Sequence, residues 1–303
     1  MPTTNMKTVS LVLGSGGARG LAHIGVIHWL EENDFKITSI VGCSIGAVIG
    51  GIYAAGKLDE YEQWVRSLTK VDILTLLDLS WDKSGLVRGD KLINTLINLV
   101  GKKLIEDLTI SYTAVATDIK GEKEIWIKSG SLFDAMRASF AIPLFFTPFK
   151  YKGVDLVDGG VLNPVPIAPT FGDETDMTIA VNLGGPAESP EKLSAVSAAP
   201  AFPSSAFREK INRFINRFQQ SVPSSNSRDW GMYDIAIQAF DAMQSTIARQ
   251  KLAAYPPDIL IEIARNACRT LEFYRASEMI ELGHRKAKEC LSQAALQKWN
   301  IEH

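Results

Sequence analysis

Cysteine and histidine are scarce in this 303-residue sequence, and its charges nearly cancel. The three cysteines form no closely spaced pair, so we expect neither a disulfide framework nor a zinc site, and a reducing compartment fits best. A formal net charge of −2 does not favour a nucleic-acid partner. The N-terminal apolar run at residues 9–13 is shorter than the apolar core of a secretory signal, which favours a cytoplasmic protein.

Long hydrophobic runs are also rare, and the main exception is ITSIVGCSIGAVIGGIYAAG at residues 37–56. These twenty residues carry no charge, and that length fits a transmembrane helix. Five glycines and only seven Ile or Val residues, however, make membrane insertion marginal. The same stretch contains Gly42-x-Ser44-x-Gly46, the pattern of a nucleophile elbow, in which a strand turns sharply into a helix at a strained serine. We favour the elbow, and a buried strand–turn–helix with a chance motif is the alternative.

A glycine-rich loop, GSGGARG at residues 14–20, follows the first expected strand and opens a helix. It does not match a dinucleotide-binding fingerprint, because Arg19 stands where the last glycine is needed, and it lacks the lysine of a P-loop. The backbone N–H groups of such a loop converge and stabilise an anion, which beside a nucleophile makes an oxyanion hole. Arg19 either orients the loop and adds positive potential or is an ordinary surface arginine.

The base that would activate Ser44 is not an obvious histidine. None of the histidines occupies the late loop where an α/β-hydrolase carries its catalytic one: they are His23, His28, His284 and His303. We therefore expect His23 to pack or to bond locally. Asp158-Gly159-Gly160 ends an expected strand, and strand ends are where active sites gather in parallel sheets. This favours a Ser-Asp dyad of Ser44 and Asp158, with a simple Asp-Gly turn as the alternative.

Short β-branched runs alternate with helical patterns along most of the chain. Strands are expected at residues 9–13, 39–42, 112–119, 123–127, 154–157, 177–183 and 258–263. Helices are expected after residue 20 and at residues 45–56, 58–79, 91–100, 207–218 and 274–299, with another that ends near residue 247. This alternation predicts a mainly parallel sheet that is covered on both faces.

The glycine loop, the elbow and the Asp-Gly-Gly strand end, in this order and spacing, resemble the patatin-like phospholipase family. The similarity is greatest to its short bacterial RssA-like branch and covers at least residues 9–183. Three further stretches support it, at residues 19–26, 137–143 and 257–261. The resemblance implies a three-layer α/β/α fold and a lipid acyl hydrolase that needs no cofactor, metal or calcium.

The resemblance also assigns roles to single residues. Ser44 is implied as the nucleophile and Asp158 as its base. The oxyanion-hole loop comprises Ser15, Gly16, Gly17 and Arg19, and the motif glycines are Gly42, Gly46, Gly159 and Gly160. Ser15 stands where many family members have a glycine, so its part in the oxyanion hole rests on its backbone N–H.

The chain divides into a catalytic core at residues 8–184, a linker or lid at 185–206 that is rich in Pro, Ala and Ser, and a helical region at 207–303. The last region contains the strand near 258–263, which we expect to pack on the core. The helix at 207–218 combines basic residues with an aromatic face. It either docks on an anionic membrane surface, as a peripheral contact at the inner membrane, or covers its own core.

We therefore expect a serine hydrolase that cleaves acyl esters of lipids, of the phospholipase A or lysophospholipase type. The alternatives are a catalytically weak regulatory protein that binds partners and an acyltransferase with a similar elbow. The aromatic segment at residues 140–149 either lines an acyl pocket or packs in the core. The sequence sets neither the head group, the chain length nor the oligomeric state.

Overall fold

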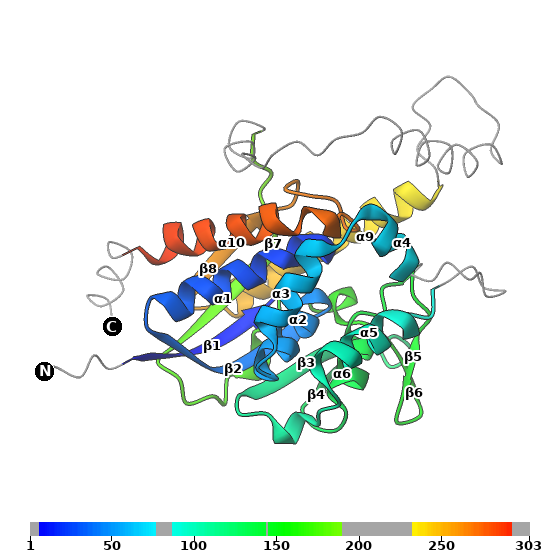
Figure 1. Ribbon diagram of the computed structural model, residues 1–303, viewed down its shortest axis with the longest axis horizontal. Coiled ribbons are helices and arrows are strands. Elements are labelled where there is room, and N and C mark those ends of the chain that lie inside the picture. The colour runs from blue at the N-terminus through cyan, green and yellow to red at the C-terminus, as the bar shows by residue number, and fades with distance from the viewer. Residues whose placement is uncertain (1–5, 77–86, 144, 190–231, 293–303) are drawn as a thin grey trace, which may run out of the picture.

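The computed structural model describes residues 6–76, 87–143, 145–189 and 232–292. Its described residues form an eight-stranded sheet whose strands are linked by the pairings β5-β6-β3-β2-β1-β7-β8, and β4 also pairs with β3, along the edge opposite β2 and β6 (Figure 1). The strands are β1 (Lys7–Leu13), β2 (Phe35–Cys43), β3 (Ser111–Asp118), β4 (Lys123–Ile127), β5 (Phe149–Tyr151), β6 (Val154–Asp158), β7 (Met177–Gly185) and β8 (Ile259–Ala264). The strands β3, β2, β1, β7 and β8 run parallel to one another. Strands β4 and β6 pair antiparallel with β3, and β5 pairs antiparallel with β6. The predicted mainly parallel sheet is confirmed.

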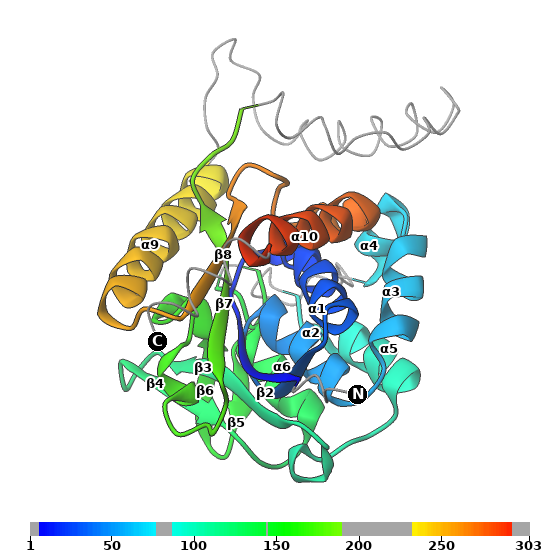
Figure 2. The same ribbon diagram turned by 90° about the vertical axis from the view of Figure 1, so that its left-hand side faces the viewer.

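Helices cover both faces of the sheet, as Figure 2 shows. The helices are α1 (Ala22–Glu32), α2 (Ile45–Ala54), α3 (Leu58–Ser67), α4 (Lys70–Leu76), α5 (Asp90–Val100), α6 (Leu132–Ser139), α9 (Met232–Ala254) and α10 (Ala276–Leu291). Helices α1, α2 and α10 lie on one face, and α9 lies on the other (Figure 2). The three-layer α/β/α fold is therefore confirmed.

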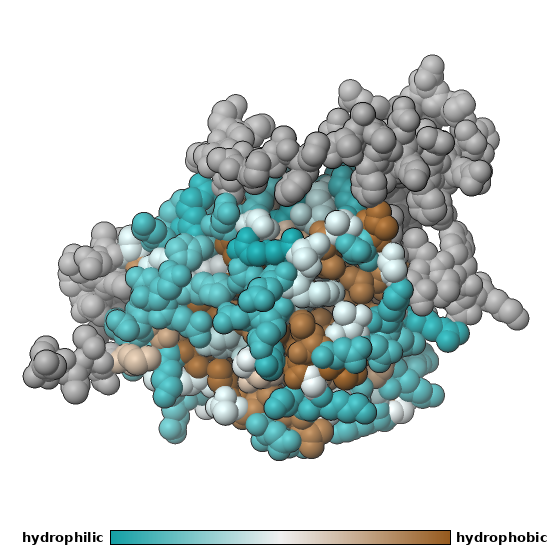
Figure 3. Space-filling model, in the orientation of Figure 1, coloured by the Kyte–Doolittle hydropathy of each residue, from teal (hydrophilic) through white to brown (hydrophobic). Residues whose placement is uncertain are grey.

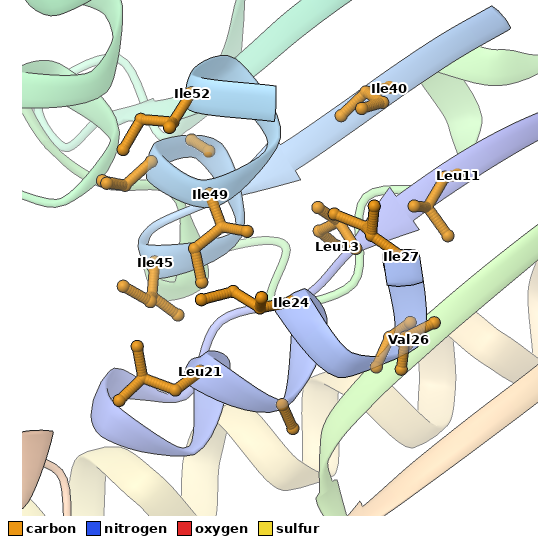
Figure 4. Packing of buried hydrophobic residues seen from close by; sticks show 14 of the residues in the cluster. Leu11, Leu13, Leu21, Ile24, Val26, Ile27, Ile40, Ile45, Ile49 and Ile52 are labelled. Carbon is orange, nitrogen blue, oxygen red and sulfur yellow. The ribbon is translucent and has the colours of Figure 1, made fainter. Parts of the chain in front are cut away.

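Side chains of β1 alternate between the two faces of the sheet and so contribute to two hydrophobic clusters. Leu11 and Leu13 point into the larger core, where they meet the aliphatic side chains of α1 and α2 (Figure 4). Val12 points the other way, into a smaller cluster with Ala180 of β7 and Ala248 of α9. A central strand buried on both faces reads as a continuous apolar run, which is why VSLVL predicts this strand so clearly.

The uncharged stretch at residues 37–56 does not form a membrane helix. Its first part belongs to β2 and its second part to the ten-residue helix α2, with Ser44 at the turn between them. It lacks charge because nearly all of it is buried in the protein. No helix within the described residues is long and apolar enough to cross a bilayer.

Other expectations need correction. Residues 58–76 of the single helix expected at 58–79 form two helices, because Leu68 takes an extended conformation between α3 and α4, and residues 77–79 lie outside the described residues. Strand β2 begins four residues earlier than expected, and the short elements α6 and β5 were not predicted. The linker's residues 190–206, the helix at 207–218 and residues 293–299 of the last helix lie outside the described residues.

The C-terminal segment joins the fold through β8 and α10. Strand β8 pairs with β7, and α10 packs along α1. The two helices meet at glycines: a Cβ added to Gly25 would lie 1.9 Å from the Ile280 carbonyl oxygen, and one added to Gly283 would lie 1.9 Å from that of Ala22. Only residues without a side chain permit this close approach of two backbones.

We predict that Gly283→Ala destabilises the protein by about 3 kcal/mol or more, because the new methyl group forces α10 away from α1. Urea unfolding monitored by circular dichroism measures the change. The control is Gly172→Ala, since Gly172 is exposed and a Cβ there meets nothing within 4 Å. An unchanged midpoint for Gly283→Ala would show that the two helices are not held at this distance.

Candidate active site

Ser44 occupies the sharp turn between β2 and α2. Its backbone lies at φ 56° and ψ −123°, a strained conformation for a residue with a side chain. The turn is crowded on both sides: a Cβ on Gly42 would lie 2.5 Å from the Ala47 nitrogen, and one on Gly46 would lie 2.1 Å from the Leu13 carbonyl oxygen. The glycines of the G-x-S-x-G pattern are thus required by the turn itself.

Helix α6 holds this strained turn in place. The Ser44 N–H donates to Ser139 Oγ at 2.8 Å, and Ser139 Oγ donates to the Val115 carbonyl of β3 at 2.6 Å. Ser139 is fully buried, so the two bonds form away from water. Sequence reasoning missed this residue as a site residue, and its only signal was the resemblance of residues 137–143.

Asp158 reaches Ser44 because β2 and β6 share one edge of β3. Strand β2 pairs with this edge as far as Cys43, opposite Val115, and β6 takes over with Asp158 opposite Ala116. The other edge is occupied by β4. Two strands that run toward each other therefore end at adjacent positions, one leading into Ser44 and the other ending in Asp158. Gly159 follows, where a Cβ would lie 2.1 Å from the Val115 carbonyl oxygen.

The Asp158 carboxyl group is fully buried. Burial raises its pKa to about 7, and hydrogen bonding from the Ser44 hydroxyl and the Gly160 N–H acts in the opposite direction. Oδ1 accepts the Gly160 N–H at 2.7 Å. Oδ2 makes no well-aligned hydrogen bond with any described residue, although the Ser44 hydroxyl lies close enough to lower the pKa. A carboxyl group with this pKa exchanges a proton readily at neutral pH.

The glycine loop presents two free N–H groups to the cavity beside Ser44. Among the described residues, those of Gly16 and Gly17 have no acceptor, and both residues line the cavity. Gly17 has φ 57°, and a Cβ there would lie 2.5 Å from the Thr270 carbonyl oxygen. The loop leads into a 3₁₀ turn (Gly17–Leu21) and α1, so helical dipoles add to the positive potential.

The backbone of Ser15 does not take the predicted part in the oxyanion hole. Its N–H donates to the Pro164 carbonyl at 2.8 Å, so that donor is already engaged. The Ser15 side chain nevertheless lines the same cavity, and its Oγ accepts a hydrogen bond from Gln244 Nε2 at 3.3 Å.

Arg19 is buried, so its interpretation as a surface arginine is wrong. Its guanidinium donates to the Arg265 carbonyl at 2.6 Å and lies 3.9 Å from Asp241 Oδ1 on α9. These contacts join the glycine loop to the segment after β8 and to α9, so the guanidinium orients the loop.

His23 supports the same loop from inside the core. Its Nε2 lies 2.9 Å from the Gly14 carbonyl oxygen. Burial lowers the pKa of His23 to about 4, so the ring is neutral and Nε2 carries the donated proton. His28 pairs with Glu62 and His284 with Glu32, and none of these three histidines lines a cavity at Ser44. His303 lies outside the described residues.

Two cavities meet at Ser44. The first, of about 100 Å³, is almost entirely apolar and is enclosed by side chains of α2, α3, α4 and α5 together with residues 140–146 and 270–273. Figure 3 shows hydrophobic residues gathered on the surface beside α3, α4 and α5. Of the aromatic segment, Phe140, Ile142, Phe145 and Phe146 line this cavity, whereas Phe149 packs against the core. Leu144 lies outside the described residues.

The second cavity, of about 80 Å³, contains the polar groups of the site. Asp158 and the loop residues Ser15, Gly16 and Gly17 line it together with Phe240, Asp241 and Gln244 of α9. Sequence reasoning missed the α9 residues, because no motif marks them. Within the described residues, no group of His, Cys, Asp and Glu side chains could hold a metal ion.

Comparisons with known proteins show the family of the chain. The family model for patatin-like phospholipases matches residues 11–171, slightly more than half of the chain. The chain belongs to the patatin-like phospholipase family. It is 40% identical to an uncharacterized NTE family protein of Mycobacterium tuberculosis, over 93% of this chain and 91% of that protein.

Two further relatives are much longer than this chain. Patatin-like phospholipase domain-containing protein 6 of Homo sapiens is 35% identical over 59% of this chain and 13% of its own length. Lysophospholipase NTE1 of Coccidioides immitis is 28% identical over 95% of this chain and 18% of its own length. The patatin-like family model ends before β7, so α9, β8 and α10 lie beyond the part of this chain that it matches.

We predict that Asp158→Asn makes this patatin-like protein more stable relative to wild type as the pH rises. The folded-state pKa of about 7 lies above the ordinary value of 3.8, so the folded wild type binds the extra proton between these values. Its free energy of unfolding therefore falls as the pH rises from about 4 to 7, by on the order of 4 kcal/mol for a fully buried group. An asparagine removes this loss.

The measurement is the difference in unfolding free energy between variant and wild type from pH 4 to pH 8. Asp155→Asn is the control, because Asp155 lies on the same strand with its side chain 45% exposed. A difference for Asp158→Asn that does not change with pH would show that the carboxyl group is not held in an apolar environment.

Proposed function

We propose that the chain hydrolyses acyl esters of lipids through Ser44 as nucleophile and Asp158 as general base. Membership of the patatin-like phospholipase family supports a lipid hydrolase. The observation that carries the assignment is the junction on β3, where a strained serine meets a fully buried carboxyl group beside two free N–H groups. The proposal places the chain with phospholipases A and lysophospholipases.

In the first half of the reaction, ionised Asp158 accepts the Ser44 hydroxyl proton while Ser44 Oγ attacks the ester carbonyl carbon. The N–H groups of Gly16 and Gly17 stabilise the negative charge that develops on the carbonyl oxygen. Loss of one such donor typically raises the barrier by about 3 kcal/mol. The bond to the leaving oxygen then breaks, and Asp158 returns its proton to the departing alcohol.

In the second half, Asp158 accepts a proton from water, and the water oxygen attacks the acyl carbon. The bond to Ser44 Oγ breaks, Asp158 gives the proton to Ser44, and the fatty acid leaves. A pKa of about 7 suits both directions, because the same carboxyl group must take up and release a proton in each half.

The shape of the site supports one orientation of the bound ester. The apolar cavity begins at Ser44 and is walled by aliphatic and aromatic side chains, so it suits the acyl chain. The second cavity contains Asp158, which must give a proton to the leaving alcohol, so the leaving group lies there. Burying the acyl chain contributes about 0.8 kcal/mol per methylene group, which favours long chains over acetyl esters.

We predict that Ser44→Ala lowers turnover of p-nitrophenyl butyrate by at least about 10⁴-fold, because the nucleophile is lost. Labelling with a fluorophosphonate should disappear with it. Ser129→Ala serves as the control, since Ser129 is an exposed loop serine. Turnover that survives in Ser44→Ala would remove the serine from the reaction. Failure of the wild type to react with the fluorophosphonate would favour a regulatory protein that only binds.

We predict that Val48→Phe shifts the chain-length preference toward short esters. Val48 lies one helical turn after Ser44 and lines the apolar cavity, so the larger side chain fills part of the space for the acyl chain. The ratio of kcat/KM for a dodecanoate ester to that for a butyrate ester should fall about tenfold or more. The control is Val71→Phe, because Val71 is 43% exposed on α4. An unchanged ratio would show that the acyl chain lies elsewhere.

A further inference from the structure

Ser15 and Gln244 form a polar pair beside the catalytic carboxyl group. The Ser15 N–H is engaged with Pro164, so only the side chain of Ser15 is available to the cavity. Gln244 lies on α9 with 9% of its surface exposed, and its Nε2 donates to Ser15 Oγ. Because Oγ acts as the acceptor in this bond, its own proton is free to be donated.

Gly160 shows how closely these groups gather around Asp158. A Cβ placed on Gly160 would lie 2.2 Å from Gln244 Nε2, 2.8 Å from Ser15 Oγ and 3.0 Å from Asp158 Oδ1. The three side chains therefore pack around the Cα of Gly160, so closely that no side chain fits at this position. Asp158, Ser15 and Gln244 also line one cavity together with Ser44.

We propose that Ser15 and Gln244 position the water that hydrolyses the acyl-enzyme. This inference rests on the proposed reaction of Ser44 and Asp158. The attacking water must give one proton to Asp158 while its oxygen faces the acyl carbon. The Ser15 hydroxyl donates to the water oxygen, and the Gln244 amide holds Ser15 in that orientation. Both are positioning residues for the second half of the reaction.

A different role for Ser15 has a different kinetic signature. A hydroxyl that stabilised the oxyanion would assist both halves, because each passes through a tetrahedral intermediate with the same negative oxygen. A group that orients the water assists only deacylation. A p-nitrophenyl ester separates the two roles, because p-nitrophenolate leaves without needing a proton from the water-binding space.

The experiment mixes an excess of the full chain with p-nitrophenyl butyrate in a single turnover. Release of p-nitrophenolate gives the acylation rate, and mass spectrometry of acid-quenched samples follows the acylated protein as it decays. In Ser15→Ala and Gln244→Leu we expect an unchanged acylation rate and deacylation slowed about tenfold, as for the loss of one orienting hydrogen bond. Ser15→Thr, which keeps the hydroxyl, should restore most of the deacylation rate.

The control variant is Gln250→Leu, since Gln250 is exposed on the same helix. Equal slowing of acylation and deacylation would overturn the proposal in favour of an oxyanion or structural role, and unchanged deacylation would overturn it outright. A wild-type chain that forms no acylated protein, with Ser44→Ala behaving in the same way, would instead contradict the proposed function.

Discussion

Strand β3 pairs with two strands along a single edge, and the candidate site depends on that arrangement. Strand β2 arrives from one direction and β6 from the other, and they end opposite the neighbouring residues Val115 and Ala116. If β6 were parallel to β3, its C-terminal end would point away from the end of β2, and Asp158 would not lie next to Ser44. The β5-β6 hairpin therefore brings the Asp158 carboxyl group next to the turn at Ser44.

Such a junction gathers features that oppose folding. Ser44 has a strained backbone, which typically costs on the order of 1–3 kcal/mol, and Asp158 is buried without a cationic partner among the described residues. The surrounding contacts compensate by fixing the backbone from several sides: Ser139 bonds the elbow to β3, and Tyr112 donates to the Ala47 carbonyl of α2. Rigid support of this kind is what keeps a reactive geometry in place when no substrate is present.

The site residues that could be predicted from sequence are those that the backbone geometry of a few neighbouring residues requires. A turn as tight as the one at Ser44 requires glycine on both sides within the same five residues, so the sequence motif itself indicates the turn. Ser139 and Gln244 are ordinary residues in ordinary helices, and only the folded chain brings them to the site. The hydrogen bond of the Ser15 N–H could not be predicted either, because its acceptor, the Pro164 carbonyl, lies 149 positions further along the chain.

The segment beyond the matched family region holds the glycine loop at residues 14–20 in place. The Ala18 N–H bonds to the Thr270 carbonyl, and Gly17 lies so close to Thr270 that no side chain fits between them. Arg19 bonds to the Arg265 carbonyl in the same segment. This segment is held between β8, which pairs with β7, and α10, which packs on α1 at Gly25 and Gly283. The conformation that leaves the Gly16 and Gly17 N–H groups free therefore depends on residues more than 240 positions away, so the folded unit around the candidate site extends through α10.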